Sequence, residues 1–254
     1  MKNKYSLIFL ILTIIYSISG SFAQENNSKV PSENNGWLVL LNNPKLSEKW
    51  GYTMEAQIRR SDFFLNPEQM LFRTGVDYYI NSKTSVTAGY AFISTWPYGK
   101  LSRADVNNEQ RIWQQVMMNS TTGKLFFNHR YRLEQRWMEK YMIKKDGLPL
   151  PDGHDYFNRF CYRLLMQIPL NKGTMEENTV FLAVSNEAFV NFGKSKSILF
   201  EQNRAYLGFG YRFSSNSSIQ LGYLNQALLK DDGKMLANHH IIQLLLAYNL
   251  LRNS

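Results

Sequence analysis

Polar and apolar residues alternate with a period of two along much of the chain. Between residues 127 and 137, one set of alternate positions is largely aromatic or apolar: Phe127, His129, Tyr131, Leu133, Gln135 and Trp137. The intervening set is almost fully ionised: Asn128, Arg130, Arg132, Glu134 and Arg136. A period of two predicts a β-strand whose two faces meet different surroundings.

Eleven strand-like segments follow one another, and no helical pattern separates them. They cover residues 37–42, 49–60, 68–80, 84–96, 108–118, 124–138, 156–169, 178–190, 200–213, 217–229 and 238–250. Most are longer than the usual globular strand of about 5–6 residues. They fit a tilted membrane-crossing strand, which needs about 9–11 residues. Segments 108–118 and 178–190 alternate poorly, so their register stays open.

The links between these segments alternate between short and long, as in outer-membrane barrels with short periplasmic turns and longer outer loops. Counted from residue 49, this phasing predicts ten crossing strands. Segment 37–42 would be a partial strand or would pair with a twelfth. The long link 139–155 should lie outside the cell and the C-terminus in the periplasm.

These patterns predict an all-β fold, an antiparallel up-and-down transmembrane β-barrel of about 10–12 strands with a polar, Arg-rich interior. Aromatic side chains lie where an interfacial girdle is expected: Trp50, Tyr78, Tyr90, Trp96, Trp137, Tyr156, Tyr211, Tyr223 and Tyr248. The alternative is a soluble periplasmic β-sandwich that binds lipid between two sheets.

The N-terminus has the pattern of a secretory signal peptide. Lys2 and Lys4 precede an apolar stretch from Leu7 to Ile18, and Ser21-Phe22-Ala23 forms a small-x-small cleavage site. We expect a signal peptide at 1–23 cleaved near Ala23, a flexible lead-in at 24–36, and one barrel domain at 37–254. The expected location is the outer membrane of a Gram-negative cell.

Charge and composition restrict the partners. The formal charge is +9, or +7 (9 − 2) once Lys2 and Lys4 are removed. The surplus Arg is dispersed along strands, so a nucleic-acid interface is not expected. The expected partners are outer-membrane lipid, lipopolysaccharide and the barrel assembly machinery, with the protein itself a monomer. Cys161 is the only cysteine, which excludes an internal disulfide.

Several short motifs resemble a known family. They are Trp37, the run Asn42-Asn43-Pro44-Lys45-Leu46-Ser47-Glu48-Lys49-Trp50, the run Glu55-Ala56-Gln57-Ile58-Arg59, and Tyr131-Arg132-Leu133-Glu134-Gln135-Arg136. Together they are similar to the DUF2490 family. The resemblance implies an exported outer-membrane barrel of Bacteroidetes-type bacteria with unassigned function, and it supplies no catalytic residues.

The candidate site is the set of charged residues on the inward-facing positions. These are Glu55, Arg59, Arg73, Asp77, Arg130, Arg132, Glu134, Arg136, Arg159, Arg163, Arg204 and Arg212. Because unpaired confined charges are costly, we expect Arg–carboxylate networks across strands. Such a lumen could rigidify a small barrel, form an anion-selective constriction, or bind an anionic ligand.

The leading interpretation is a non-catalytic barrel, either structural or a narrow channel for small polar or anionic solutes. The rival is a membrane-embedded lipid-active hydrolase or acyltransferase built on His129 and a serine such as Ser185. No nucleophile elbow accompanies them. No cofactor is expected, and no metal site either, since His239 and His240 are adjacent and point to opposite faces.

Overall fold

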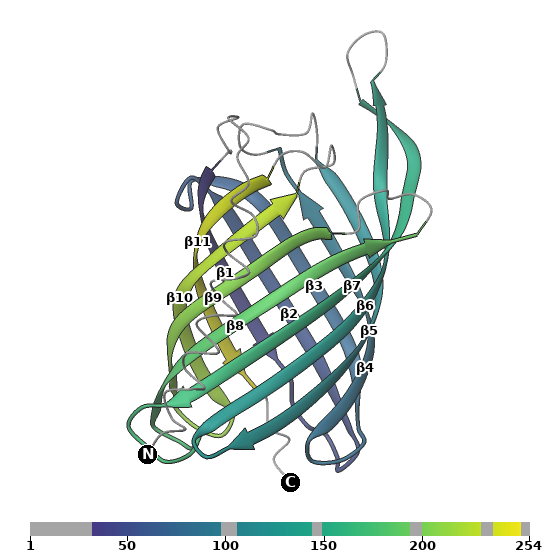
Figure 1. The fold of residues 1–254 in the computed structure, drawn as a ribbon. Coiled ribbons are helices and arrows are strands. Elements are labelled where there is room, and N and C mark those ends of the chain that lie inside the picture. Colours follow the sequence, from purple (N-terminus) through teal and green to yellow (C-terminus); the bar gives the residue numbers. More distant parts are fainter. Residues whose placement is uncertain (1–31, 98–105, 144–148, 194–199, 230–235, 250–254) are drawn as a thin grey trace.

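The computed structural model describes residues 32–97, 106–143, 149–193, 200–229 and 236–249. The expected signal peptide, and the lead-in up to residue 31, lie outside this part of the chain. The described residues form eleven β-strands and no helix (Figure 1). The strands are β1 (Ser32–Asn42), β2 (Trp50–Ser61), β3 (Asn66–Tyr79), β4 (Thr84–Thr95), β5 (Asn107–Thr122), β6 (Leu125–Ile143), β7 (Pro149–Pro169), β8 (Thr179–Phe192), β9 (Phe200–Arg212), β10 (Ser217–Leu229) and β11 (Leu236–Tyr248). Within the same ranges, no helix has the length and apolar character needed to cross a membrane.

The strands close into one barrel, and this confirms the prediction of an all-β, mostly antiparallel barrel of about 10–12 strands. Each strand pairs antiparallel with the next, and β1 closes the wall by pairing in parallel with β11. An odd number of alternating strands requires this parallel pair, because the first and last strands then run in the same direction. The sandwich alternative is therefore wrong, since a single closed wall replaces two packed sheets.

The predicted count of ten crossing strands is wrong as well. β1 is a full strand that starts at Ser32, five residues before the predicted segment. Residues 32–36 had been assigned to the lead-in, but they pair with 238–242 of β11. The pattern missed them because Ser32, Glu33, Asn34 and Asn35 are polar.

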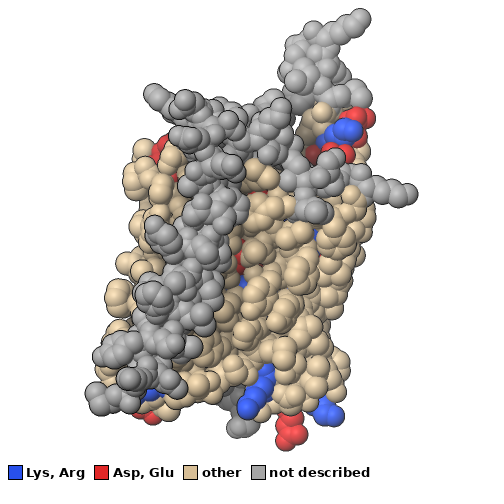
Figure 2. Space-filling model, in the orientation of Figure 1, with Lys and Arg blue, Asp and Glu red and all other residues tan. Residues whose placement is uncertain are grey.

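The two faces of the wall differ as the alternation predicts. In β3, Arg73 and Asp77 are buried in the interior, whereas Met70 and Val76 are more than half exposed on the outside. The visible outer wall carries mainly uncharged side chains, and the charged ones gather at the two ends (Figure 2). The barrel is thus apolar outside and charged inside.

Apolar side chains also fill part of the interior, as two separate clusters. Trp113 packs on Leu71, Ala91 and Ile93 inside β3–β5. The other cluster consists of Trp37, Phe181, Ala183, Tyr206, Leu224 and Ile241. Glycines make room for these rings, as expected for glycines on an inward face. A Cβ on Gly89 would lie 2.8 Å from Trp113 Cε2 and would clash with the carbonyl oxygen of Thr74.

The hairpin between β6 and β7 extends beyond the barrel rim (Figure 1). Residues 139–155 were expected to form a loop. In the structure residues 139–143 and 149–155 are strand residues, and 144–148 lie outside the described residues. β5 pairs with β6 only as far as Met138, and β8 pairs with β7 only from Asn158. The two strands of this extension therefore pair only with each other.

The interior glycines give a first test of the packing. We expect Gly89→Val to lower the free energy of unfolding by at least about 1–3 kcal/mol, because its Cβ clashes with the Thr74 backbone and its methyl groups overpack the Trp113 cluster. The neighbouring Ala88→Val, on the exposed outer face, should change it far less. Urea unfolding in detergent micelles measures both. Equal effects of the two substitutions would contradict the described orientation of β4.

Candidate functional site in the barrel interior

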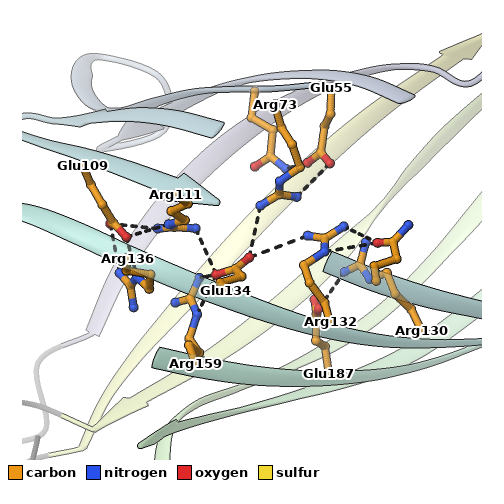
Figure 3. A network of polar contacts seen from close by, with 12 residues as sticks. Glu55, Arg73, Glu109, Arg111, Arg130, Arg132, Glu134, Arg136, Arg159 and Glu187 are labelled. Atoms are coloured by element: carbon orange, nitrogen blue, oxygen red, sulfur yellow. Dashed lines mark hydrogen bonds and ion pairs between the residues drawn. The ribbon is translucent and has the colours of Figure 1, made fainter. Parts of the chain in front are cut away.

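Glu134 of β6 lies at the centre of a charged network inside the barrel (Figure 3). Its side chain is only 1% exposed, and guanidinium groups from four strands surround it. The nitrogen–oxygen distances are 2.5 Å to Arg159, 3.5 Å to Arg73, 3.5 Å to Arg111 and 3.9 Å to Arg132. One carboxylate therefore links β3, β5, β6 and β7 across the lumen.

Further carboxylates extend the network toward both sides. Glu109 accepts hydrogen bonds from Arg111 Nε at 2.6 Å and from both Nε and Nη2 of Arg136. Glu201 accepts from Arg136 Nη1 at 2.8 Å and from Arg159 Nη1 at 2.7 Å. These bonds confirm the expectation of Arg–carboxylate networks across strands.

Glu55 and Glu187 complete the set of paired carboxylates. Arg73 Nη1 donates to Glu55 Oε2 at 3.0 Å. Arg130 Nη2 donates to Glu187 Oε1 at 2.6 Å. The ion pairs thereby reach from β2 to β9, and each strand that contributes a charge is held in its register.

Two β-bulges place additional carboxylates inside. Arg59 pairs with Gln69 while Arg60 pairs with Pro67, so Glu68 is an extra residue in β3. Phe189 pairs with Gln202 while Val190 pairs with Phe200, so Glu201 is an extra residue in β9. A bulge re-aims the side chain of its extra residue. Both bulged residues are glutamates, and both line the interior cavity.

Two of the predicted site residues, Asp77 and Arg212, neither form ion pairs with described residues nor line the interior cavity. Asp77 is buried, but its carboxylate accepts hydrogen bonds from the hydroxyl groups of Thr53 and Thr87 rather than from Arg. Arg212 lies at the end of β9 and donates to the carbonyl oxygens of Ser214 and Ser215 in the adjoining turn. Arg212 therefore acts as a turn residue.

The other ten predicted residues line a cavity of about 830 Å³. Sequence reasoning missed Arg111, Glu109, Glu187, Glu68 and Glu201, all of which line it too. The first three lie in segments whose alternation is poor, and the last two lie at bulges. With these carboxylates included, the interior is closer to charge balance than the sequence indicated.

Three cavity-lining arginines have no carboxylate oxygen within 4.0 Å among the described residues: Arg59, Arg163 and Arg204. Their hydrogen-bond partners are the amide oxygens of Gln57, Gln69, Asn128 and Gln202. Glu68 and Glu187 line the same cavity and attract these arginines electrostatically, but neither forms an ion pair with them.

The residues of the hydrolase alternative do not meet. His129 is on the outer side, and its Nδ1 lies 3.0 Å from the hydroxyl oxygen of Tyr162. Ser185 lines the interior cavity. The barrel wall separates the two side chains, so they form no nucleophile–base pair. Within the described ranges, no group of three or more His, Cys, Asp or Glu residues is arranged to hold a metal ion.

These observations define an eleven-stranded closed β-barrel with an ionised interior. The family model described as "Protein of unknown function (DUF2490)" matches residues 34–236, and the chain belongs to this family. No curated protein and no solved structure matches the chain.

The network predicts a large effect for one neutralising substitution. Glu134→Gln keeps the side-chain shape but leaves four guanidinium groups without their shared carboxylate. We expect the free energy of unfolding to fall by about 3–5 kcal/mol, the usual cost of breaking a buried ion pair. Urea titration in detergent micelles measures this change.

The matched control is Asp155→Asn on the hairpin extension. Asp155 lies 4.0 Å from Lys140, and both side chains are more than half exposed. Loss of this ion pair should lower the free energy of unfolding by less than about 1 kcal/mol, as for other surface pairs. If Glu134→Gln cost no more than this control, the network would not hold the barrel together.

Proposed function

We propose that this protein is a non-catalytic β-barrel of the bacterial outer membrane whose lumen is a narrow passage for small polar solutes, preferentially anions. The observation that carries the proposal is the inverted distribution of side chains, with an apolar outer wall around a charged interior. This is the arrangement expected of a barrel in lipid.

The apolar outer surface continues around the whole barrel. Every strand presents at least one large exposed hydrophobic side chain: Leu40, Ile58, Phe72, Phe92, Ile112, Tyr131, Phe160, Val180, Phe209, Leu221 and Ile242. Water-soluble monomers rarely expose contiguous apolar patches larger than a few hundred Å². A hydrocarbon environment removes this cost.

Charged residues avoid the central part of the outer wall. β4, β10 and β11 contain no Asp, Glu, Lys or Arg. In β2, Arg60 faces outward only at the rim, where it donates to the carbonyl oxygens of Phe64 and Leu65. The signal-peptide pattern at 1–23 adds independent support for export.

The interior favours a narrow passage over a wide pore. The Glu134 network crosses the lumen, and the two apolar clusters occupy further space. The residues that line the cavity include Arg59, Arg163 and Arg204, whose guanidinium groups have no carboxylate oxygen within 4.0 Å among the described residues. Cationic side chains along a pore favour anions.

The membrane location can be tested with an outward-facing charge. Phe209 is 62% exposed on β9. In lipid, Phe209→Arg should destabilise the barrel by about 2–4 kcal/mol if it lies near the bilayer midplane. We expect less heat-modifiable protein in the outer-membrane fraction, compared by gel migration with and without boiling. Ser82→Arg, in an exposed turn, is the control. Release of the wild-type protein by osmotic shock would rule out the membrane location.

The passage can be tested by conductance in planar bilayers. We expect small channels whose reversal potential in a KCl gradient shows a preference for chloride. Arg163→Gln should reduce that preference, because it removes a charge that lines the cavity, while Arg212→Gln at the turn should not. If the barrel inserts correctly but conducts no ions, the passage is ruled out and the structural role remains.

A further inference from the structure

Arg59 and Arg204 approach the same aromatic ring. The guanidinium carbon of Arg59 lies 3.8 Å from the centroid of the Trp37 ring, and that of Arg204 lies 5.0 Å from it. Cations at this distance from an indole are attracted by its π-system. Two like charges thus gather around one ring, although they repel each other.

The Trp37 ring is held in place by the bulged glutamate. Trp37 Nε1 donates to Glu68 Oε2 at 3.3 Å, and Asn35 Nδ2 donates to the same oxygen at 3.1 Å. The ring is 2% exposed. The bulge in β3 therefore fixes the surface on which the two guanidinium groups lie.

Within the described part of the chain, the hydrogen-bond acceptors of Arg59 are all neutral amide oxygens. Its Nε and Nη2 donate to Gln57 Oε1 at 3.0 and 2.6 Å, and its Nη1 donates to Gln69 Oε1 at 2.7 Å. These amides orient the guanidinium group without cancelling its charge. A guanidinium group presents five N–H donors in a planar fork that matches carboxylate and phosphate oxygens, and no ion pair with a described residue occupies the fork of Arg59.

Arg204 has fewer partners still. Its Nη2 makes one long hydrogen bond of 3.5 Å to Gln202 Oε1, and its buried Nε has no partner. A buried guanidinium nitrogen without an acceptor is costly. The guanidinium carbon of Arg204 also lies 4.8 Å from the centroid of the Phe189 ring.

Arg163 adds a third positive charge, two strands away from Arg204 on the inner face of the barrel. Arg163 is opposite Glu187 on β8, which is in turn opposite Arg204 on β9. Glu187 makes its ion pair with Arg130 instead of with either of them. Like that of Arg204, the buried Nε of Arg163 has no partner.

We infer that Arg59 and Arg204, arranged around Trp37, form a binding site for the oxyanion group of a small molecule, with Arg163 as an additional positive charge. The chemistry of the group is that of a phosphate or a carboxylate, whose oxygens match the donor fork of a guanidinium group. The cavity of about 830 Å³ is within the usual range for small-molecule sites. This inference rests on the proposed function only for the anion preference of the lumen, and does not require a membrane location.

The test is calorimetric titration of the full-length protein in detergent micelles with sodium phosphate and, separately, sodium acetate. Sodium chloride keeps the ionic strength constant. We expect saturable binding of at least one oxyanion, with quenching or enhancement of tryptophan fluorescence that is lost in Trp37→Phe. Arg204→Gln should weaken binding roughly tenfold or more, because one charge-assisted hydrogen bond is worth about that factor. Arg59→Gln should have a similar effect.

Two matched variants test whether weaker binding comes from the loss of a site residue or only from the loss of one positive charge. Arg60→Gln changes the exposed neighbour of Arg59, and Arg212→Gln changes the turn residue at the end of the Arg204 strand. Both remove one positive charge, and both should keep wild-type affinity. Arg204→Lys should give an intermediate affinity, because it keeps the charge and loses the fork. Heat-modifiable migration shows that each variant is folded.

The results distinguish this inference from the proposed function. Saturable binding that Arg204→Gln weakens supports the site, even in a protein that fractionates away from the outer membrane. A folded wild-type barrel that binds neither phosphate nor acetate overturns the site, whatever its location. Equal affinity in wild type and in folded Arg204→Gln overturns it too. Phosphate and acetate affinities, compared directly, identify which oxyanion the site prefers.

Discussion

The sharing of the Glu134 carboxylate by four guanidinium groups is the constraint on which the rest of the barrel depends. The charged residues of the network come from strands between β2 and β9, and each side chain must point into the lumen to form its ion pair. A slip of one residue in any of these strands would turn its charge to the apolar outside. Buried ion pairs often add little stability over an apolar core, but a broken one is expensive. The network therefore specifies the register more than it adds stability.

The interior divides into two parts with different roles. Around Glu134, every guanidinium group has a carboxylate partner within 4.0 Å. Around Trp37, Arg59 and Arg204 are held by amide oxygens and aromatic rings and form no ion pair with described residues. The two bulged glutamates contribute to both parts, since Glu201 completes the first and Glu68 orients the ring in the second.

Period-two alternation was sufficient to predict the fold class, most strand positions and the face on which Arg132, Glu134 and Arg136 lie. It could not predict the residues that break the period. A bulge inserts one residue and reverses the face of its side chain. Strict alternation therefore assigns Glu68 and Glu201 to the outer face, although both line the interior. Alternation also carries no information on partners, which depend on strands distant in sequence. For this reason Asp77 and Arg212 were assigned to the network, although one binds threonines and the other caps a turn.

The parallel pair of β1 and β11 joins residues that are 206 positions apart (238 − 32). All other neighbours in the wall are joined by a local hairpin. Closing a long loop carries an entropic cost that short hairpins avoid, and non-local pairing slows folding. Before β11 arrives, both β1 and β10 expose an edge with unpaired backbone groups, which can pair with another chain. The wall therefore keeps two open edges until nearly the whole chain is present, and the pairing of its last strand with its first removes both edges in one step.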